Sequence, residues 1–209
     1  MALYDIIVAD PAWGFNDGLK KMKRRAKRSA ESQYKTMPMS HIAALPVKKL
    51  ANPRGCLLAL WVPGSMIQHG LEVMRAWGFS HKQVFVWVKL KKGHQKEKDI
   101  NNGTRVGMGH LFRQSHEIAL IGTSGKSVYP YMKNHSQRSV SFDLNIGHSI
   151  KPETLQKRLE LMFPNANKLE MYARRVRPGW DCLGNEIDGR DLVDSVGDIA
   201  KENTDLGLV

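Results

Sequence analysis

The sequence predicts an α/β protein built around a mostly parallel, doubly wound sheet. Short apolar runs alternate along the chain with segments of helical periodicity, which is the pattern of strands joined by crossover helices. Most of these runs are apolar throughout, as expected of parallel strands that helices cover on both faces. We expect the strands at residues 4–9, 56–62, 83–89, 117–121 and 168–172.

Two segments between these runs have clear helical patterns. In 152–163 a proline suits the first helical position, and apolar residues recur at helical spacing: Leu155, Leu159, Met162 and Phe163. In 66–77 the helix is expected to begin with a capping box formed by Ser65 and Gln68. Ser40 is expected to cap a further, shorter helix.

The composition fits one globular domain followed by an acidic tail. The chain has 209 residues, of which 42% are hydrophobic and 25% charged, enough apolar material for one sizeable core. These values exclude a largely disordered chain, a collagen-like fibre and a disulfide-stapled miniprotein. From Asp188 onward there are six acidic residues and only two basic ones. We therefore expect one domain over residues 1–189 and an acidic C-terminal tail over 190–209.

The charge balance favours a polyanionic partner. Lys and Arg number 32 against 20 Asp and Glu, a formal net charge of +12. Such an excess indicates nucleic acid first and a membrane surface second. Seven basic residues lie within 20–28, among them Lys23, Arg24, Arg25, Lys27 and Arg28. This run is either a solvated, mobile segment or an arm that contacts phosphates, and both interpretations can hold.

The cysteines and the apolar runs indicate a soluble protein of the cytoplasm. Cys56 and Cys182 are the only cysteines, so there is neither a disulfide framework nor a zinc-ligand spacing. No basic stretch followed by an apolar run opens the chain, as a signal peptide would require. The longest apolar run, 56–62, is too short to cross a bilayer. We expect no bound metal.

The residues best suited to chemistry follow the first strand, as Asp10-Pro11-Ala12-Trp13. Ligands of doubly wound sheets bind beyond the carboxyl ends of the strands. The Asp10 carboxylate and the Pro11 carbonyl offer two acceptors for the hydrogens of an exocyclic base amine, and Trp13 offers a flat face for an extruded base. The carboxylate also stabilises positive charge that develops on the nitrogen during methylation. Alone, the four residues also fit a strand end that turns at Asp-Pro and buries a tryptophan.

Further motifs follow this tetrad in a fixed order. They are Leu-Trp-Val at 60–62, the stretch 109–117, Ser-Ile-Lys-Pro at 149–152, the run 168–174 and Gly-Asn-Glu at 184–186. Together with the tetrad, this set resembles the adenine-amino (N-6) methyltransferase family related to the catalytic subunit of the eukaryotic messenger-RNA adenine methylase. The resemblance covers nearly the whole chain up to about Gly189, and it points to the phage and bacterial DNA-modifying branch.

The resemblance implies a Rossmann-like, S-adenosylmethionine-dependent methyltransferase fold with permuted motif order, in which the catalytic tetrad comes first and the donor site is completed late. By resemblance, Lys151 pairs with the methionine carboxylate of the donor, Glu170 and Arg174 line its pocket, and Asn185 with Glu186 binds its ribose hydroxyls. Each residue also has a simpler interpretation as a surface, strand-end or turn residue.

Two residues have less certain counterparts in the family. Tyr34 matches an aromatic residue near the target base, although it also fits packing onto the domain. Glu117 matches an acidic residue at the start of a strand, where its role is either functional or structural.

Two departures from the family pattern bear on the site. Ala12 replaces the second proline of the usual Asp-Pro-Pro-Trp, which puts the rigidity of the tip and one apolar wall of the base pocket in doubt. Only Met1–Leu3 precede the first strand, whereas longer relatives contact the donor adenine from a segment at this place. The sequence does not identify what replaces that contact.

The function expected from the resemblance is methylation of the adenine amine in DNA, with S-adenosylmethionine as donor. The small size and basic charge suggest low sequence specificity, as in phage or prophage enzymes. Three alternatives remain: the same reaction on RNA, a non-catalytic nucleic-acid-binding homologue, and methylation of the cytosine amine.

Overall fold

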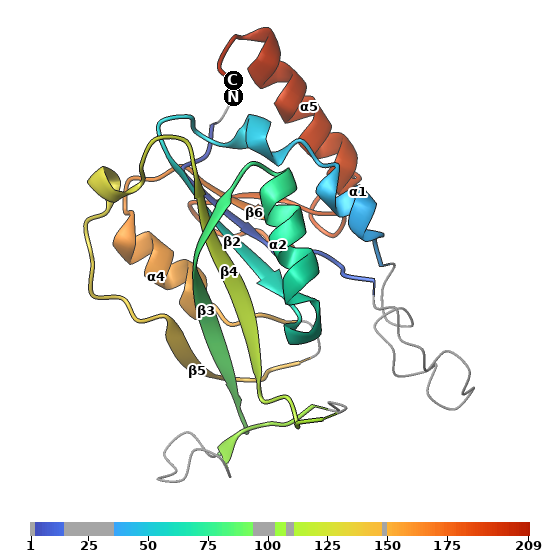
Figure 1. Ribbon diagram of the computed structural model, residues 1–209, viewed down its shortest axis with the longest axis vertical. Helices are drawn as coiled ribbons and strands as arrows, with labels where there is room; N and C mark the ends of the chain where they lie inside the picture. The colour runs from blue at the N-terminus through green and yellow to red at the C-terminus, as the bar shows by residue number, and fades with distance from the viewer. Residues whose placement is uncertain (1–2, 15–35, 94–102, 108–110, 148–149) are drawn as a thin grey trace.

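A single seven-stranded sheet forms the centre of the molecule (Figure 1). The computed structural model describes residues 3–14, 36–93, 103–107, 111–147 and 150–209. The strands are β1 Ile6–Ala9, β2 Cys56–Val62, β3 Ser80–Leu90, β4 His116–Ser124, β5 Val140–Leu144, β6 Lys168–Met171 and β7 Asp181–Leu183. The helices are α1 Met39–Ala43, α2 Ile67–Ala76, α4 Thr154–Met162 and α5 Leu192–Asp205, with short 3₁₀ turns η4 Val47–Leu50, η5 Gly64–Met66 and η6 Tyr129–Tyr131.

The strand order is β5-β3-β4-β2-β1-β6-β7, and four of the six strand pairs are parallel. Strand β4 runs antiparallel to both of its neighbours, β2 and β3. The prediction of a mostly parallel α/β sheet is therefore confirmed. The antiparallel β4 was not predicted, because an apolar run has the same appearance in either direction when both of its faces are covered.

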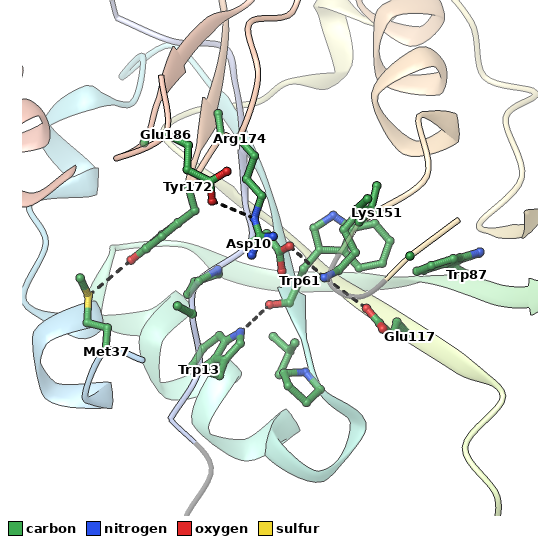
Figure 2. Close-up of a pocket in the computed structure, with 18 of the residues that line it drawn as sticks. Asp10, Trp13, Met37, Trp61, Trp87, Glu117, Lys151, Tyr172, Arg174 and Glu186 are labelled. Atoms are coloured by element: carbon green, nitrogen blue, oxygen red, sulfur yellow. Dashed lines mark hydrogen bonds and ion pairs between the residues drawn. The ribbon is translucent and has the colours of Figure 1, made fainter. Parts of the chain in front are cut away.

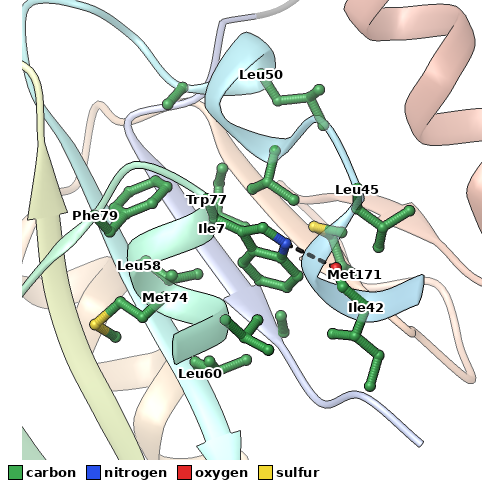
Figure 3. Close-up of a cluster of buried hydrophobic side chains, with 14 of the residues drawn as sticks. Ile7, Ile42, Leu45, Leu50, Leu58, Leu60, Met74, Trp77, Phe79 and Met171 are labelled. Carbon is green, nitrogen blue, oxygen red and sulfur yellow. Dashed lines mark hydrogen bonds between the residues drawn. The ribbon is translucent and has the colours of Figure 1, made fainter. Parts of the chain in front are cut away.

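Helices cover both faces of the sheet and bury alternate residues of each strand. On β1, Ile7 and Ala9 belong to a core that includes Val73 and Trp77 from α2. Ile6 and Val8 face the opposite way, toward the core beneath α4. Figure 3 shows the first core, where the indole Nε1 of Trp77 donates to the carbonyl of Ile42 across 2.9 Å. This hydrogen bond satisfies a polar group that burial would otherwise leave costly.

The chain beyond residue 190 forms mainly the helix α5, which packs onto the domain. Leu192, Val196 and Ala200 of α5 are buried in the first core, and the Asn203 amide donates to the carbonyl of Lys49 across 2.9 Å. The tail was predicted from its charge alone, whereas its apolar residues recur at helical spacing and pack onto the domain. The acidic side chains of α5 occupy its exposed outer face.

The predicted helix caps are wrong in detail. Pro38 stands at the N-cap of α1, so Ser40 lies inside the helix. Helix α2 begins after the 3₁₀ turn η5, with Met66 at its N-cap and no side-chain capping bond. The capping-box pattern of Ser65 and Gln68 failed because that turn continues directly into the helix. In the described part of the chain, no helix has the length and apolar character that crossing a membrane requires.

Candidate active site

A cavity of about 500 Å³ opens at one edge of the sheet, where several strands end or begin. The tetrad lines it directly after β1, Arg174 follows β6, and Asn185 with Glu186 follows β7. Because β4 is antiparallel, its first residues, including Glu117, lie at this same edge. The fold therefore gathers at one place residues that are more than 170 positions apart (Figure 2).

Four side chains of alternating charge line the cavity and contact one another in the order Asp10, Lys151, Glu117 and Lys89. The Lys151 ammonium lies 2.8 Å from Oδ2 of Asp10 and 3.2 Å from Oε2 of Glu117. Lys89, near the end of β3, pairs with the other oxygen of Glu117. The ammonium of Lys151 also lies 5.6 Å from the ring of Trp61, within cation–π range. An ammonium carries three donors, so Lys151 can keep both carboxylates and still donate to a ligand.

The protonation states follow from this arrangement. Burial alone would lower the pKa of Lys151, but the carboxylates of Asp10 and Glu117 raise it above its usual value. Burial alone would raise the pKa of Glu117, but Lys151 and Lys89 bring it below its usual value. Burial raises the pKa of Asp10, and the ammonium of Lys151 opposes that rise. Lys151 is therefore the positive charge that favours the ionised form of Asp10 against the effect of burial.

The tetrad differs from expectation at its last residue. Trp13 is only 3% exposed, and its indole Nε1 donates to the carbonyl of Trp61 across 2.9 Å. The predicted open face for base stacking does not match this geometry, because the apolar ring packs into the core while it borders the cavity. The carbonyl of Pro11 accepts from the backbone N–H of Trp13 at 2.8 Å, which leaves its second lone pair for a ligand.

The predicted donor residues are only partly brought together. Arg174 and Glu186 line the cavity and approach each other to 3.6 Å, with both side chains well exposed. Oδ1 of Asn185 accepts from the backbone N–H of Leu192 at 3.1 Å, which ties the start of α5 to the cavity. Glu170 lies outside the cavity lining and is bonded instead to Gln156 and Arg177.

Two backbone features shape the donor side of the cavity. Tyr172 has a φ of 62°, an uncommon conformation for a residue with a side chain. A Cβ at Gly184 would lie 2.1 Å from the carbonyl oxygen of Ala173, so only glycine fits there. Both residues line the cavity, so the two loops after β6 and β7 approach each other closely where Asn185 is presented.

The predicted substrate residues Tyr34, Lys23, Arg24, Arg25, Lys27 and Arg28 lie outside the described residues. The structure describes the chain on either side of them. The N–H of Met37 donates to the carbonyl of Ala12 across 2.9 Å, and Trp13 pairs with Met37 in a parallel bridge. The described residues on either side of that segment, Trp13 and Met37, therefore both line the cavity.

Sequence reasoning missed Lys89 and Tyr172 as cavity residues. Lys89 is a polar residue near the end of an apolar run, the same signal that drew attention to Asp10. Tyr172 follows a strand end and has no such signal, because its position depends on a backbone conformation that the sequence does not reveal. Among the described residues, no group of three or more His, Cys, Asp and Glu side chains is arranged to hold a metal ion.

The comparison with protein families decides the relationship, because the MT-A70 family model matches residues 4–186. The chain belongs to the MT-A70 family. The match begins before β1 and ends at Glu186, so it includes the tetrad, Lys151, Arg174 and Asn185. Methyltransferases of this family use S-adenosylmethionine as the methyl donor.

The relatives include N(6)-adenosine-methyltransferases of plants and animals and a type II methyltransferase of a Mycoplasma. The chain is 28% identical over 197 residues to a probable N(6)-adenosine-methyltransferase of Oryza sativa and 26% identical over 197 residues to the human catalytic subunit METTL3. Each alignment covers 91% of this chain but only 24% and 29% of the relative, respectively. The chain is also 27% identical to the type II methyltransferase M.MunI of a Mycoplasma, with 94% of this chain and 83% of the relative covered.

Proposed function

We propose that this chain transfers a methyl group from S-adenosylmethionine to the exocyclic amine of adenine in DNA. The single observation that carries the proposal is the carboxyl group of Asp10, which follows β1, lies 2.8 Å from the ammonium of Lys151 and lines the cavity. A carboxylate that is paired with an ammonium and borders a cavity suits chemistry in which positive charge develops on a bound nitrogen.

The residues of the cavity fit the donor. Its carboxylate would be held by the remaining donor of Lys151, and its ribose hydroxyls by Asn185 and Glu186. These are a cation for an anion, and an amide and an acid for a diol. When bound, S-adenosylmethionine supplies a methyl group activated by a sulfonium sulfur. We leave Glu170 out of this set, because it does not line the cavity and is bonded to Arg177 and Gln156.

The tetrad prepares the amine for attack. The lone pair of an exocyclic amine is conjugated with the ring, so the nitrogen is a poor nucleophile. Asp10 and the Pro11 carbonyl would each accept one of its hydrogens and favour the geometry that frees the lone pair. As the nitrogen becomes bonded to carbon it gains positive charge, which the Asp10 carboxylate stabilises before a proton leaves.

The length of the relatives favours DNA as the polymer. This chain covers 83% of the length of the bacterial relative M.MunI. It covers only about a quarter of the length of the METTL3-like relatives. The net charge of +12 fits a polyanion without specifying its sequence. We assign phosphate contacts to the basic segment with Lys23, Arg24, Arg25, Lys27 and Arg28, a neighbouring base contact to Tyr34, and low sequence specificity to the reaction.

Nucleoside mass spectrometry tests this function directly. The chain and S-adenosylmethionine are incubated with duplex DNA, single-stranded DNA or RNA, and each polymer is then digested to nucleosides. We expect N-6-methyladenine, most abundantly in DNA. Methylation confined to RNA would transfer the same chemistry to the other polymer, and methylated cytosine would change the base. No methylated nucleoside in any polymer, despite nucleic-acid binding, would favour the non-catalytic homologue.

A further inference from the structure

The outer edge of the sheet next to β5 carries exposed aromatic rings beside basic side chains. We call residues 125–139, which connect β4 to β5, the edge strap. Tyr129 and Tyr131 in the edge strap are 66% and 48% exposed, and Phe142 of β5 is 51% exposed. The tryptophans of the described chain, by contrast, are all buried. Exposing several large rings together is costly unless they serve a partner.

The edge strap contains basic residues and no acidic ones. Between Glu117 and Asp143 the sequence contains no Asp or Glu, whereas Lys126, Lys133 and Arg138 lie within the edge strap. All three side chains belong to exposed residues. A segment of cations interleaved with aromatic rings has the composition of a single-strand binding platform, since cations contact phosphates and rings stack on bases.

The backbone of the edge strap is held in place, so its outward side chains are preorganised. The N–H of Lys133 donates to the carbonyl of Met162 at the end of α4 across 2.7 Å. Arg158 of α4 donates to the carbonyls of Arg138 and Val140, the latter at 2.9 Å. Val128 and Met132 turn inward and pack against the core beneath α4. The intervening and flanking rings therefore face outward on a fixed backbone.

Two rings of the edge strap already lie against each other. The ring centroids of Tyr129 and His135 are 5.1 Å apart, with their planes inclined by 48°. Asn134 stabilises the turn that brings them together, since its Oδ1 accepts from the N–H of Ser136 at 2.9 Å. The contact with His135 restricts the ring of Tyr129, so a base can stack on its outer face at low entropic cost.

The edge strap leads to the candidate active site. It continues into β5, five residues that span about 17 Å at the usual rise of a strand. Asn145 and Gly147, just past the end of β5, line the cavity. A strand of nucleic acid whose adenine occupies the cavity can therefore extend along β5 and then along residues 132–139 to η6, which holds Tyr129 and Tyr131 and lies toward the far end of the sheet in Figure 1.

We infer that the edge strap binds the single-stranded flank of the nucleic acid whose adenine enters the cavity. Tyr129 and Tyr131 stack on unpaired bases, while Lys133 and Arg138 contact phosphates. This inference rests on the proposed function, because it assigns the occupant of the surface from the substrate of the cavity. A fully paired duplex offers no free bases, so it engages only the cations.

The test compares strand lengths by fluorescence anisotropy without the donor, on DNA and on RNA. One variant is Tyr129→Ala with Tyr131→Ala, and its matched control is the double change to Phe, which keeps both rings. On strands of about 16 nucleotides we expect the Ala variant to bind roughly fivefold or more weakly and the Phe variant to bind like the parent. On strands of about 4 nucleotides centred on adenine, all three should bind alike.

A second variant tests the cations. Lys133→Gln with Arg138→Gln should flatten the slope of log affinity against log salt on a single strand, by about 0.7 for each phosphate that the variant no longer neutralises. The control, Arg75→Gln with Lys201→Gln, removes the same charge from exposed positions on α2 and α5, across the sheet, and should leave the longer-strand affinity nearer the parent value.

The results separate the two proposals. Affinities for long strands that are unchanged in both edge-strap variants would overturn the inference, as would equal weakening on long and short strands. Nucleoside mass spectrometry of the same preparations reports the reaction independently. Length-dependent binding without methylation would refute the proposed function alone, whereas methylation with unchanged edge-strap binding would refute the edge strap alone. The DNA and RNA arms show which polymer supplies the strand.

Discussion

Lys151 is the residue on which both halves of the site depend. It contacts the carboxylate assigned to the amine, Asp10, and the supporting carboxylate, Glu117, at 2.8 and 3.2 Å. Its pKa is raised by these same groups, so it stays charged throughout the physiological range. A single ammonium thus contacts the carboxylate proposed to act on the amine and faces the place proposed for the carboxylate of the donor.

Lys151→Met tests the donor half. Losing a hydrogen bond to a charged group costs roughly 1.5–3 kcal/mol, which is about a tenfold or greater reduction of affinity. We therefore expect isothermal titration calorimetry to show S-adenosylmethionine binding weakened by at least about tenfold.

Lys168→Met is the matched control for that variant. Lys168 is also a partly buried lysine, but it lies at the opposite end of β6 and donates to the carbonyl of Ala166. Its removal should leave donor affinity near the parent value. Unchanged affinity in a folded Lys151→Met protein would remove Lys151 from the donor site.

At the scale of elements, Arg177 joins two walls of the cavity. It lies in the loop between β6 and β7, its side chain is 10% exposed, and its Nε donates to Glu170 across 2.8 Å. It also pairs with Glu153, which lies two residues after Lys151 at the start of α4. The segment that presents Lys151 is thereby fixed to the strand whose end presents Arg174.

Arg177→Met should therefore destabilise the fold and loosen the donor site together. Removing one partner of a buried ion pair costs about 3–5 kcal/mol, and the partial exposure of Glu153 reduces this to about 1–3 kcal/mol in the free energy of unfolding. Urea denaturation measures the first effect and calorimetry the weaker binding of S-adenosylmethionine.

Arg175→Met provides the comparison. Arg175 pairs with the same Glu153, but its side chain is 57% exposed, and Glu170 is bonded to Arg177 instead. We expect a change close to zero in unfolding free energy and in donor affinity. Equal effects of Arg175→Met and Arg177→Met would show that the ion pairs of Arg177 with Glu153 and Glu170 do not hold α4 and β6 together.

At the scale of the whole molecule, the fold class and the central strands could be predicted from the sequence, whereas one strand direction and the last helix could not. The fully apolar run at Cys56–Val62 was predicted as a strand with identical bounds, because seven buried residues in succession leave no other interpretation. The direction of β4 and the helix α5 were missed. Strand direction is decided by pairing partners distant in the chain, and the acidic residues of α5 masked the apolar stripe of Leu192, Val196 and Ala200.

The site was predictable where a residue's chemistry and its place at a strand end agree. The family order of motifs placed Asp10 and Lys151 in one site although 141 positions separate them, but the contact between the two side chains was not predicted. The prediction for Glu170 followed the same order but could not include Arg177, whose ion pair turns that carboxylate away from the cavity lining. The burial of Trp13 fits the simpler interpretation of the tetrad, a strand end that turns at Asp-Pro and buries a tryptophan.

The central claim is that Asp10 is the acceptor that makes the adenine amine reactive. The most direct measurement is the single-turnover rate of methyl transfer by Asp10→Ala, with donor affinity determined by calorimetry on the same preparation. Because the substitution removes a preorganised electrostatic interaction, we expect the rate to fall on the order of a hundredfold or more while S-adenosylmethionine binding is largely retained. A folded Asp10→Ala protein that binds the donor and methylates adenine at nearly the parent rate would contradict the account.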